Sequence, residues 1–305
     1  MRLPICLSLL LACASAFAQT DATPYDGPII DVHLHVGKAA PGAPNPATGQ
    51  PTTANTDADR ERLTLERMRR HGIVLGLVSG PDEAMASMRR AGGDAIWPGA
   101  FLDDGSTPLP PPDVLREAFA SGELKVLGEI GAQYHGLDPS DEWFEPYLAL
   151  AEELDIPVGI HTGLGPPGSP YGCCPKFSAG LGNPMRLEPM LKRHPKLRVW
   201  LMHAGWPYLQ ETKAILYMYP QVHADVAVIN WIIPRREFHE YLQALMTAGF
   251  GDRLMFGSDQ MIWPESITLA VEGVDSATFL TPEQKRAIFH DNAARFLKLP
   301  AKAGR

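Results

Sequence analysis

The chain has 305 residues, of which 45% are hydrophobic and 20% are charged. This composition is that of an ordinary globular protein and excludes a disordered, collagen-like or coiled-coil chain. The formal net charge is −8, from 35 acidic and 27 basic residues, so the sequence lacks the basic excess that is typical of nucleic-acid binding. Four cysteines are too few for a disulfide scaffold, and a chain of this length can bury a large core without one.

The first 18 residues have the pattern of a secretory signal peptide. Arg2 supplies a positive charge, Ile5–Ala12 is a short apolar segment, and Ala16-Phe17-Ala18 resembles a cleavage site made of small residues. We therefore expect residues 1–18 to be removed and residues 19–305 to form one domain. The expected location is the periplasm or the exterior.

A second interpretation of the same segment is a lipoprotein signal. Leu10-Leu11-Ala12-Cys13 would be the lipid box, with the lipid on Cys13. It ranks behind simple cleavage because the second position of the box is poor and the segment before Cys13 is short. No later stretch is long and apolar enough for a membrane-spanning helix, so we expect no integral membrane segment in the mature chain.

Eight short apolar runs recur along the chain and predict buried parallel strands. They are rich in Val, Ile and Leu, and they mostly lack the polar alternation of a half-exposed strand. The runs are Pro28–Val36, Ile73–Gly80, Ile96–Leu102, Lys125–Tyr134, Ile156–Gly163, Arg198–Gly205, Val222–Ile229 and Arg253–Asp259.

The segments between these runs predict helices. Thr56 and Asp59 resemble a capping box, Gly72 is placed as a C-cap, and a helix after Pro81 would end at Gly92. Eight strands alternating with helices predict a single-domain α/β fold, the (β/α)8 TIM barrel. The alternative is a doubly wound open sheet, which would usually show a glycine-rich phosphate turn that this sequence lacks. The later helices are expected at Asp113–Ala120, Glu145–Leu154, Met185–Arg193, Pro207–Met218, Arg235–Ala248 and Pro282–Leu297.

Histidines and carboxylates cluster at the predicted carboxyl ends of the strands. His33 and His35 are two residues apart at the end of the first run, a spacing that aims both imidazoles to one face. Barrel active sites are built at this end of the strands, so the side chains should converge. Imidazole and carboxylate are suitable ligands for zinc, manganese or iron. The six candidate metal ligands are His33, His35, Glu129, His161, His203 and Asp259.

The remaining histidines have other expected roles. Five of them fall on predicted helices or early in a strand, where structural roles are the simpler interpretation. His135 follows the fourth run and is a candidate substrate contact, with a purely structural role equally open. The five are His71, His194, His223, His239 and His290.

The ligand pattern resembles the amidohydrolase superfamily. His33-Leu34-His35, His161, His203 and Asp259 stand where that superfamily has its metal signature, and Asn292–Phe296 resembles the closing helix of the amidohydrolase-related family. The resemblance covers nearly the whole mature chain. It implies a metal-activated water that attacks a carbonyl or phosphoryl centre, with Asp259 as the catalytic residue that handles the proton.

The strand-four position departs from the pattern of many two-metal members. Those members bridge the ions with a carboxylated lysine at the end of this strand, but Lys125 opens it and Glu129 stands near its end. A bridging Glu resembles the deoxyribonuclease branch, whereas decarboxylase members use one metal and need no bridge. Glu129 favours two ions, and the alternative is that it orients a histidine.

Three functions follow from these patterns. The first is a metal-dependent hydrolase that cleaves an amide, ester or lactone of a small, partly aromatic substrate, with one or two divalent ions, zinc being the first choice. The second is a single-metal, non-oxidative decarboxylase. The third is a binding protein without turnover, against which the complete ligand set counts. A small molecule is the expected partner, and a homo-oligomer is compatible with the sequence.

Aromatic residues and two long loops surround the predicted mouth of the barrel. The loops at 38–55 and 163–184 follow the first and fifth runs and are expected to lie over the catalytic face. Tyr134, Trp206 and Trp263 are candidate substrate contacts, and packing at the rim is an equally good interpretation of them. Tyr208 and Trp231 also lie just beyond a predicted strand end, and the same two interpretations apply to them. Arg235 and Arg236 are expected to be solvated surface charges.

The mature chain keeps two adjacent cysteines. We expect Cys173 and Cys174 to be loop thiols without a role, because the geometry of a disulfide between neighbours is hard to reach along one peptide bond. Metal binding or oxidation of this pair is a weaker alternative.

Overall fold

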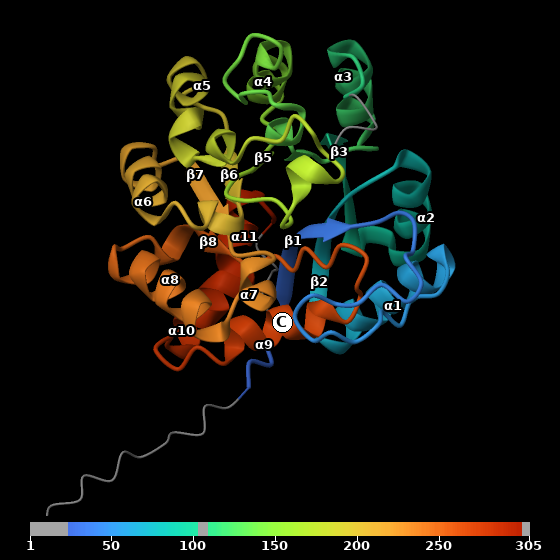
Figure 1. Cartoon of the computed structure of the whole chain (residues 1–305). Coiled ribbons are helices and arrows are strands. Elements are labelled where there is room, and N and C mark those ends of the chain that lie inside the picture. The colour runs from blue at the N-terminus through green and yellow to red at the C-terminus, as the bar shows by residue number, and fades with distance from the viewer. Residues whose placement is uncertain (1–23, 103–108, 301–305) are drawn as a thin grey trace, which may run out of the picture.

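The structure is a computed structural model, and it describes residues 24–102 and 109–300. The expected signal peptide, including Cys13, lies outside the described residues. Eight parallel strands pair in chain order with helices between them, which confirms the predicted barrel (Figure 1). The strands are β1 (Ile29–His35), β2 (Ile73–Ser79), β3 (Ile96–Leu102), β4 (Val126–Ile130), β5 (Val158–His161), β6 (Val199–Met202), β7 (Val222–Asp225) and β8 (Leu254–Met255).

The last strand meets the first through the segment that follows it. β8 has only two residues, yet the backbone N–H of Val32 donates to the carbonyl of Phe256 at 3.0 Å. Further along, the N–H of Asp259 donates to the carbonyl of His33 at 2.7 Å. These bonds hold the β8 segment against β1 and bring the last predicted ligand beside the first.

Helices follow the strands much as the sequence predicts. At the start of the first helix, the Thr56 hydroxyl accepts a hydrogen bond from the N–H of Asp59 at 3.0 Å, which confirms this cap. Two helices were not expected: a short one after β7 and another after β8. The helices are α1 (Asp57–Arg70), α2 (Asp82–Gly92), α3 (Pro112–Ser121), α4 (Glu145–Glu153), α5 (Glu188–Arg193), α6 (Leu209–Met218), α7 (Ile229–Ile232), α8 (Arg235–Thr247), α9 (Ser266–Asp275), α10 (Pro282–Arg286) and α11 (Asn292–Phe296).

Two apolar clusters stabilise the barrel. The larger one contains buried side chains of the strands and of the surrounding helices. The smaller one joins Leu75 of β2 to Trp200 of β6, and these strands lie on opposite sides of the barrel, so this cluster spans the interior. Phe296 and Leu297, at the end of α11, belong to the smaller cluster. The interior is therefore filled with side chains, as in other barrels of this kind.

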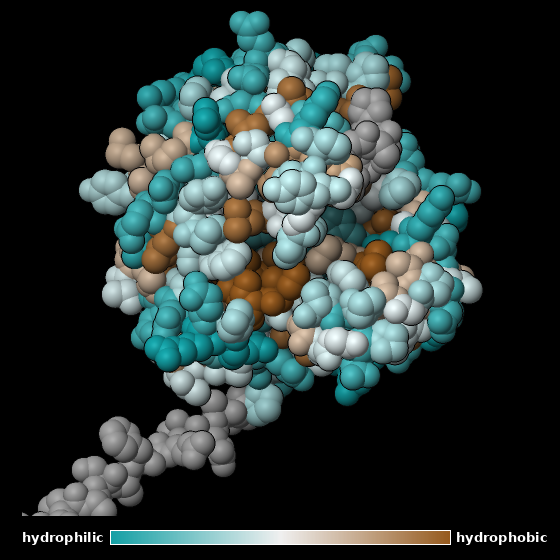
Figure 2. All heavy atoms as spheres, in the orientation of Figure 1, coloured by the Kyte–Doolittle hydropathy of each residue, from teal (hydrophilic) through white to brown (hydrophobic). Residues whose placement is uncertain are grey.

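The outer surface is largely hydrophilic. Figure 2 shows polar residues over most of the visible face and an apolar patch near its centre, at the position of α7 in Figure 1. Within residues 24–102 and 109–300, no helix combines the length and the apolar character needed to cross a bilayer.

Candidate metal centre and active site

The six predicted ligands meet at the carboxyl ends of their strands. His33 and His35 come from β1, Glu129 from β4 and His161 from β5. His203 follows β6, and Asp259 follows β8. All are buried except His35, whose side chain is 14% exposed. The barrel thus brings together residues that are far apart in the chain.

Four groups face one another at the β1–β8 side of the centre. Nε2 of His35 lies 3.1 Å from Oε2 of Glu129 and 3.1 Å from Oδ1 of Asp259. Nε2 of His33 lies 3.4 Å from the same Glu129 oxygen and 3.9 Å from Asp259. Two imidazoles therefore share two carboxylates.

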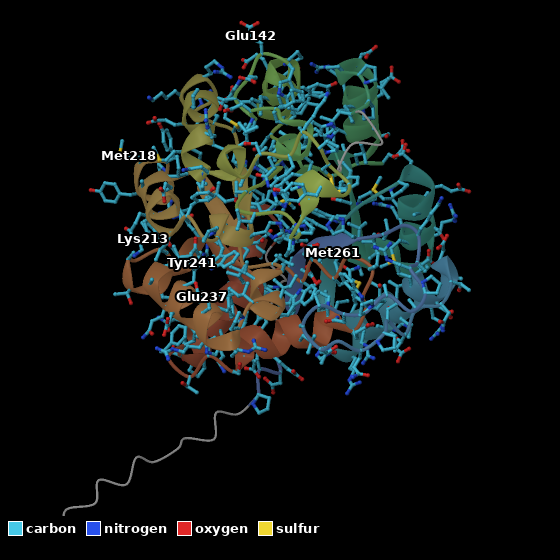
Figure 3. All side chains as sticks on the ribbon, viewed as in Figure 1. Glu142, Lys213, Met218, Glu237, Tyr241 and Met261 are labelled. Carbon is cyan, nitrogen blue, oxygen red and sulfur yellow. A yellow bond between two sulfur atoms is a disulfide. The ribbon has the colours of Figure 1, made fainter. Side chains whose placement is uncertain are left out.

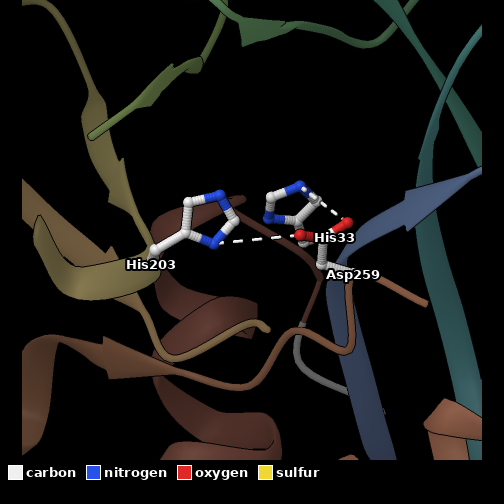
Figure 4. A group of neighbouring side chains, drawn as sticks. All are labelled: His33, His203 and Asp259. Atoms are coloured by element: carbon white, nitrogen blue, oxygen red, sulfur yellow. Dashed lines mark ion pairs between the residues drawn. The ribbon is translucent and has the colours of Figure 1, made fainter. Parts of the chain in front are cut away.

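The other oxygen of Glu129 faces the β5–β6 side. Nε2 of His161 and Nε2 of His203 each lie 3.8 Å from Oε1 of Glu129. The two imidazole rings are 4.6 Å apart and meet edge to face. Nδ1 of His203 is 3.9 Å from Oδ2 of Asp259, so Asp259 also reaches both sides (Figure 4). Glu129 lies between the two imidazole pairs, with one oxygen turned to each.

Asp225, at the end of β7, organises the centre, and the sequence analysis missed it. It is fully buried, and its Oδ2 accepts from Nδ1 of His33 at 3.2 Å and from the indole N–H of Trp200 at 3.2 Å. Its Oδ1 accepts from the backbone N–H groups of His203 at 2.8 Å and Ala227 at 3.0 Å. A carboxylate at the end of a strand was a usable signal, as it was for Glu129.

These contacts fix the tautomers of two histidines. A carbonyl or carboxylate oxygen only accepts, so Nδ1 of His33 donates to Asp225, and Nδ1 of His203 donates to the carbonyl of Ala227 at 3.1 Å. In the neutral form of each ring, Nε2 is then the nitrogen with the lone pair, and it faces the centre. This is the arrangement that protein partners impose on metal-binding histidines.

Burial and charge act differently on the histidines of the two sides. Burial opposes the charged form of His35, but Asp259 and Glu129 outweigh it and raise its pKa to about 9. The pKa of His33 also rises well above its ordinary value, since Asp259 and Asp225 overcome the cost of burial. Burial and the neighbouring ring of His203 instead lower the pKa of His161 to about 3.

The two carboxylates of the centre stay ionised. Burial opposes their charge, but His203 and His33 hold the pKa of Glu129 well below its usual range. His33 and His35 likewise outweigh burial and lower the pKa of Asp259 to about 2. The centre therefore carries two negative charges, which only protons or a cation can balance.

The donor set fits a divalent metal. Three groups of side chains each bring ligand atoms within 4.8 Å of one another: His33, His203 and Asp259; His33, His35 and Glu129; and Glu129, His161 and His203. Nε2 of His33 is buried and has no hydrogen-bond partner among the described residues. A buried nitrogen without a partner is costly unless it binds something, and nitrogen and oxygen donors together suit zinc or manganese.

Comparison with known proteins identifies the family. The model of the amidohydrolase family matches residues 30–299, nearly the whole described barrel. The chain belongs to the amidohydrolase family. It is also 25% identical over 122 residues to protein fluG of Emericella nidulans, a match that spans 40% of this chain and 13% of that protein.

Solved structures share the fold of this member of the amidohydrolase family at low identity. One is a probable 2-pyrone-4,6-dicarboxylic acid hydrolase from Acinetobacter baumannii with bound citric acid: 16% identity, TM-score 0.62, 89% of this chain and 99% of that one. Another is a 5-carboxyvanillate decarboxylase from Novosphingobium aromaticivorans with bound manganese: 15% identity, TM-score 0.57, 77% of this chain and 80% of that one. At such identities the likeness establishes the fold alone.

The predicted substrate contacts of the amidohydrolase divide into two sets. Tyr134 lies at the centre, with its hydroxyl 3.1 Å from Nε2 of His161, and His135 follows it in the same short helical turn. Trp206 and Trp263 lie farther out, where their indole N–H groups bond Glu237 at 3.3 Å and the carbonyl of Ala43 at 3.2 Å. Tyr134 thus contacts a candidate ligand directly, whereas Trp206 and Trp263 bond residues outside the candidate ligand set.

Three other rim residues are accounted for by packing and solvent. Trp231 is 4% exposed and donates its indole N–H to the carbonyl of Ser258 at 2.7 Å, so it belongs to the core. Tyr208 donates its hydroxyl to the carbonyl of Ala179 at 3.0 Å. Arg236 is exposed and pairs with Glu240 on the same helix, as a solvated charge would.

The adjacent cysteines are not free thiols, which corrects the sequence-based expectation. Cys173 and Cys174 form a disulfide. The loop folds back on itself here, with the N–H of Cys174 donating to the carbonyl of Ser169 at 3.0 Å. This turn, rather than an extended backbone, brings the neighbouring sulfur atoms together. The phenyl ring of Phe177, three residues on, packs at 5.2 Å from Tyr134.

A cleft of about 480 Å³ opens beside His35. It runs between the loop after β1 and the helices α1 and α2, and it is lined by residues of both charges, among them Lys38, Arg60, Glu61 and Arg90. His35 is the candidate ligand on its wall, in agreement with its partial exposure. The cleft therefore reaches the edge of the centre at His35.

Proposed function

We propose that this amidohydrolase is a metal-dependent hydrolase that cleaves an amide, ester or lactone bond of a small, partly apolar substrate. The observation that carries the proposal is the position of Glu129. Its Oε2 faces His33 and His35 at 3.4 and 3.1 Å, and its Oε1 faces His161 and His203, both at 3.8 Å. A carboxylate with one oxygen turned to each imidazole pair is suited to bridge two cations.

In this proposal each side of the centre holds one ion. His33, His35 and Asp259 would hold the ion on one side, His161 and His203 would hold the ion on the other, and Glu129 would be shared between them. When bound, the metal supplies a Lewis acid and lowers the pKa of water from 15.7 toward about 7. Zinc is the first choice because the donors are imidazole and carboxylate, and manganese accepts the same donors.

Asp259 is the proposed proton acceptor. Its pKa of about 2 keeps it ionised at neutral pH, and its two oxygens face both sides of the centre. It would take a proton from the attacking water and deliver it to the leaving group. Asp225 keeps His33 in the required tautomer throughout.

The test combines metal analysis with product analysis. The purified chain should hold up to two zinc or manganese ions and hydrolyse members of a panel of amides, esters and lactones, with loss of activity after chelation and recovery on adding metal. A chain that retains no divalent ion would contradict the proposal. So would a metal-loaded chain that releases carbon dioxide from aromatic carboxylates but hydrolyses nothing.

The second candidate is a single-metal decarboxylase. It is supported by the β1–β8 side, where His33, His35, Glu129 and Asp259 alone offer four donors to one ion. A structural neighbour with bound manganese is named as a decarboxylase. One ion per active chain, together with carbon dioxide release, would favour this candidate over the hydrolase.

The location and assembly of the protein remain proposals from the sequence. We propose export with removal of residues 1–18, a small-molecule substrate, and self-association of the mature domain. The amino-terminal sequence of protein recovered from the periplasm should begin at Gln19. A blocked, lipid-bearing Cys13 would instead support the lipoprotein interpretation.

A further inference from the structure

We propose that Gln260 is a positioning residue that holds His35 against Asp259 and so determines how tightly the β1–β8 side binds its ion. The proposal rests on the proposed metal site. Gln260 directly follows Asp259 and is fully buried. Its amide Oε1 accepts from the backbone N–H of His35 at 3.0 Å, and its Nε2 donates to the backbone carbonyl of the same residue at 2.7 Å.

These two side-chain hydrogen bonds take the place of backbone pairing between β1 and the segment after β8. β8 has two residues, and at Asp259 the chain turns with φ of 45°, a left-handed conformation that residues with side chains rarely adopt. Backbone pairing with β1 stops at the bond from Asp259 to His33. The Gln260 side chain then offers a donor and an acceptor to His35, as a paired strand would.

His35 depends on this support more than the other candidate ligands do. Nδ1 of His33 is held by Asp225, and Nδ1 of His203 is held by the carbonyl of Ala227. Among the described residues, the ring of His35 has ion pairs only with Glu129 and Asp259, together with ring contacts to His33 at 5.2 Å and Phe101 at 5.8 Å, and none of these is a hydrogen bond to Nδ1. The direction of the His35 ring is therefore determined largely by the backbone of His35, whose N–H and carbonyl groups both bond Gln260.

A neighbouring contact extends the same connection. Arg60, on α1, is 5% exposed and donates from Nη2 to the carbonyl of Met261 and from Nη1 to the carbonyl of Lys38 at 2.9 Å. Met261 again has a left-handed φ, of 47°, and lies near the centre of the face in Figure 3. Asp259 and Gln260 are thus bonded to β1 itself, and Met261 is connected to the loop after β1 through Arg60.

The test removes the amide while keeping the volume. Gln260→Met should lower the affinity for Mn²⁺ and Zn²⁺ by about 10–100-fold, the usual effect of losing a group that orients a ligand. It should also change the visible absorption spectrum of the Co²⁺-loaded protein, since the angle of His35 to the ion changes. Affinities would be measured by competition with a chelator, and the thermal stability of the metal-free protein would be recorded alongside.

The matched control is a buried amide at the opposite end of β8. Asn292 donates from Nδ2 to the carbonyls of Gly251 at 2.8 Å and Leu254 at 2.6 Å, far from the ligands. Asn292→Leu should destabilise the metal-free protein and leave metal affinity within about twofold of the wild type. If Asn292→Leu weakens metal binding as much as it lowers thermal stability, the effect of Gln260→Met reflects a general loss of stability. The proposal is then overturned.

A milder variant covers the case in which Gln260→Met does not fold. Gln260→Asn keeps an amide but shortens its reach by one carbon–carbon bond, about 1.5 Å, so both bonds to His35 cannot be kept. Its metal affinity should fall measurably below the wild type. Wild-type affinity in a folded Gln260 variant overturns this inference alone, whereas a wild-type chain that binds no divalent ion overturns the proposed function as well.

Discussion

The two sides of the candidate metal centre use the same kinds of side chain, imidazole and carboxylate, but these are supported differently. On the β1–β8 side, His33 and His35 lie against Glu129 and Asp259, and Asp259 and Gln260 form hydrogen bonds with β1. On the β5–β6 side, His161 and His203 both face one oxygen of Glu129 at 3.8 Å, and only His203 also comes within 3.9 Å of Asp259. The first side is rich in negative charge, and the second has little.

This difference predicts an order of binding. In the metal-free protein, imidazoles beside two carboxylates hold protons, whereas His161, with a pKa of about 3, holds none at neutral pH. A cation gains most where the negative charge is greatest, so the β1–β8 side should fill first and bind more tightly. The β5–β6 side should fill second and lose its ion more readily.

Replacing one candidate ligand on each side is the strongest test of whether the two sides bind metal differently. His33→Ala should lower the affinity of the tight site by more than about 100-fold, because losing a ligand costs more than losing the group that orients it. His161→Ala should keep one ion. Metal content after gel filtration measures both variants. Equal loss in both would show that the two sides are not distinct.

The next largest effect concerns proton transfer. Asp259→Asn cannot accept a proton, so turnover should fall by about 10²–10⁴, while the ion held by His161 and His203 stays. Metal content and rate should be measured on one preparation. Asp252→Asn, an exposed carboxylate at the other end of β8, is the control and should be as active as the wild type. Near wild-type turnover with bound metal in Asp259→Asn would exclude Asp259 as the proton acceptor.

The pKa shifts predict opposite pH dependences for the two sides in the metal-free protein. His35 has a folded-state pKa of about 9, above the ordinary 6.5, so its contribution to stability is present below pH 6.5 and is lost as pH rises toward 9. His161 has a folded-state pKa of about 3, so its contribution is lost as pH falls from 6.5 toward 3. A difference of one pKa unit corresponds to about 1.4 kcal/mol, so the larger shift of His161 should give the larger contribution.

Chemical denaturation of metal-free protein across this pH range measures both contributions. His35→Asn should flatten the alkaline limb, and His161→Asn should flatten the acid limb. Bound metal should abolish the alkaline loss, because the ion replaces the protons. An alkaline limb that persists in His35→Asn and His33→Asn would place its origin elsewhere.

The smallest expected effect is that of the disulfide. Replacing both cysteines, as Cys173→Ser with Cys174→Ser, should leave the metal content unchanged, since all six candidate ligands lie elsewhere. A bridge between adjacent residues closes a minimal loop, so unfolding should become easier by only about 1 kcal/mol. Loss of bound metal in the double variant would show that the loop supports the β5–β6 side.

The sequence predicted the barrel and the convergence of the six candidate ligands for the same reason. Each apolar run marks a strand, and a histidine or carboxylate at its end can point only to the barrel mouth. Asp225 was not predicted because the apolar run that contains it continues without a break through Val226–Ile229. In the structure, β7 ends at Asp225, and the rest of the run is buried and leads into α7. The end of β7 was therefore hidden.

Other features left no pattern in the sequence. A single amide such as Gln260 gives no sequence signal that it bonds the backbone of His35, because the two residues are 225 positions apart. The disulfide depends on a turn of the loop that composition does not specify. The helix α9 was missed because residues 260–281 carry no clear cap before it.

The closure of the barrel between β1 and β8 has a consequence for how the protein is made. Gln260 lies 225 residues after His35, so one side of the centre needs both the first strand and the last. A nascent chain cannot hold an ion on that side until residue 260 has been synthesised and the ring of strands has closed. Metal capture there would mark the end of maturation, and a ribosome stalled in the second half of the message would release a fragment with an incomplete centre.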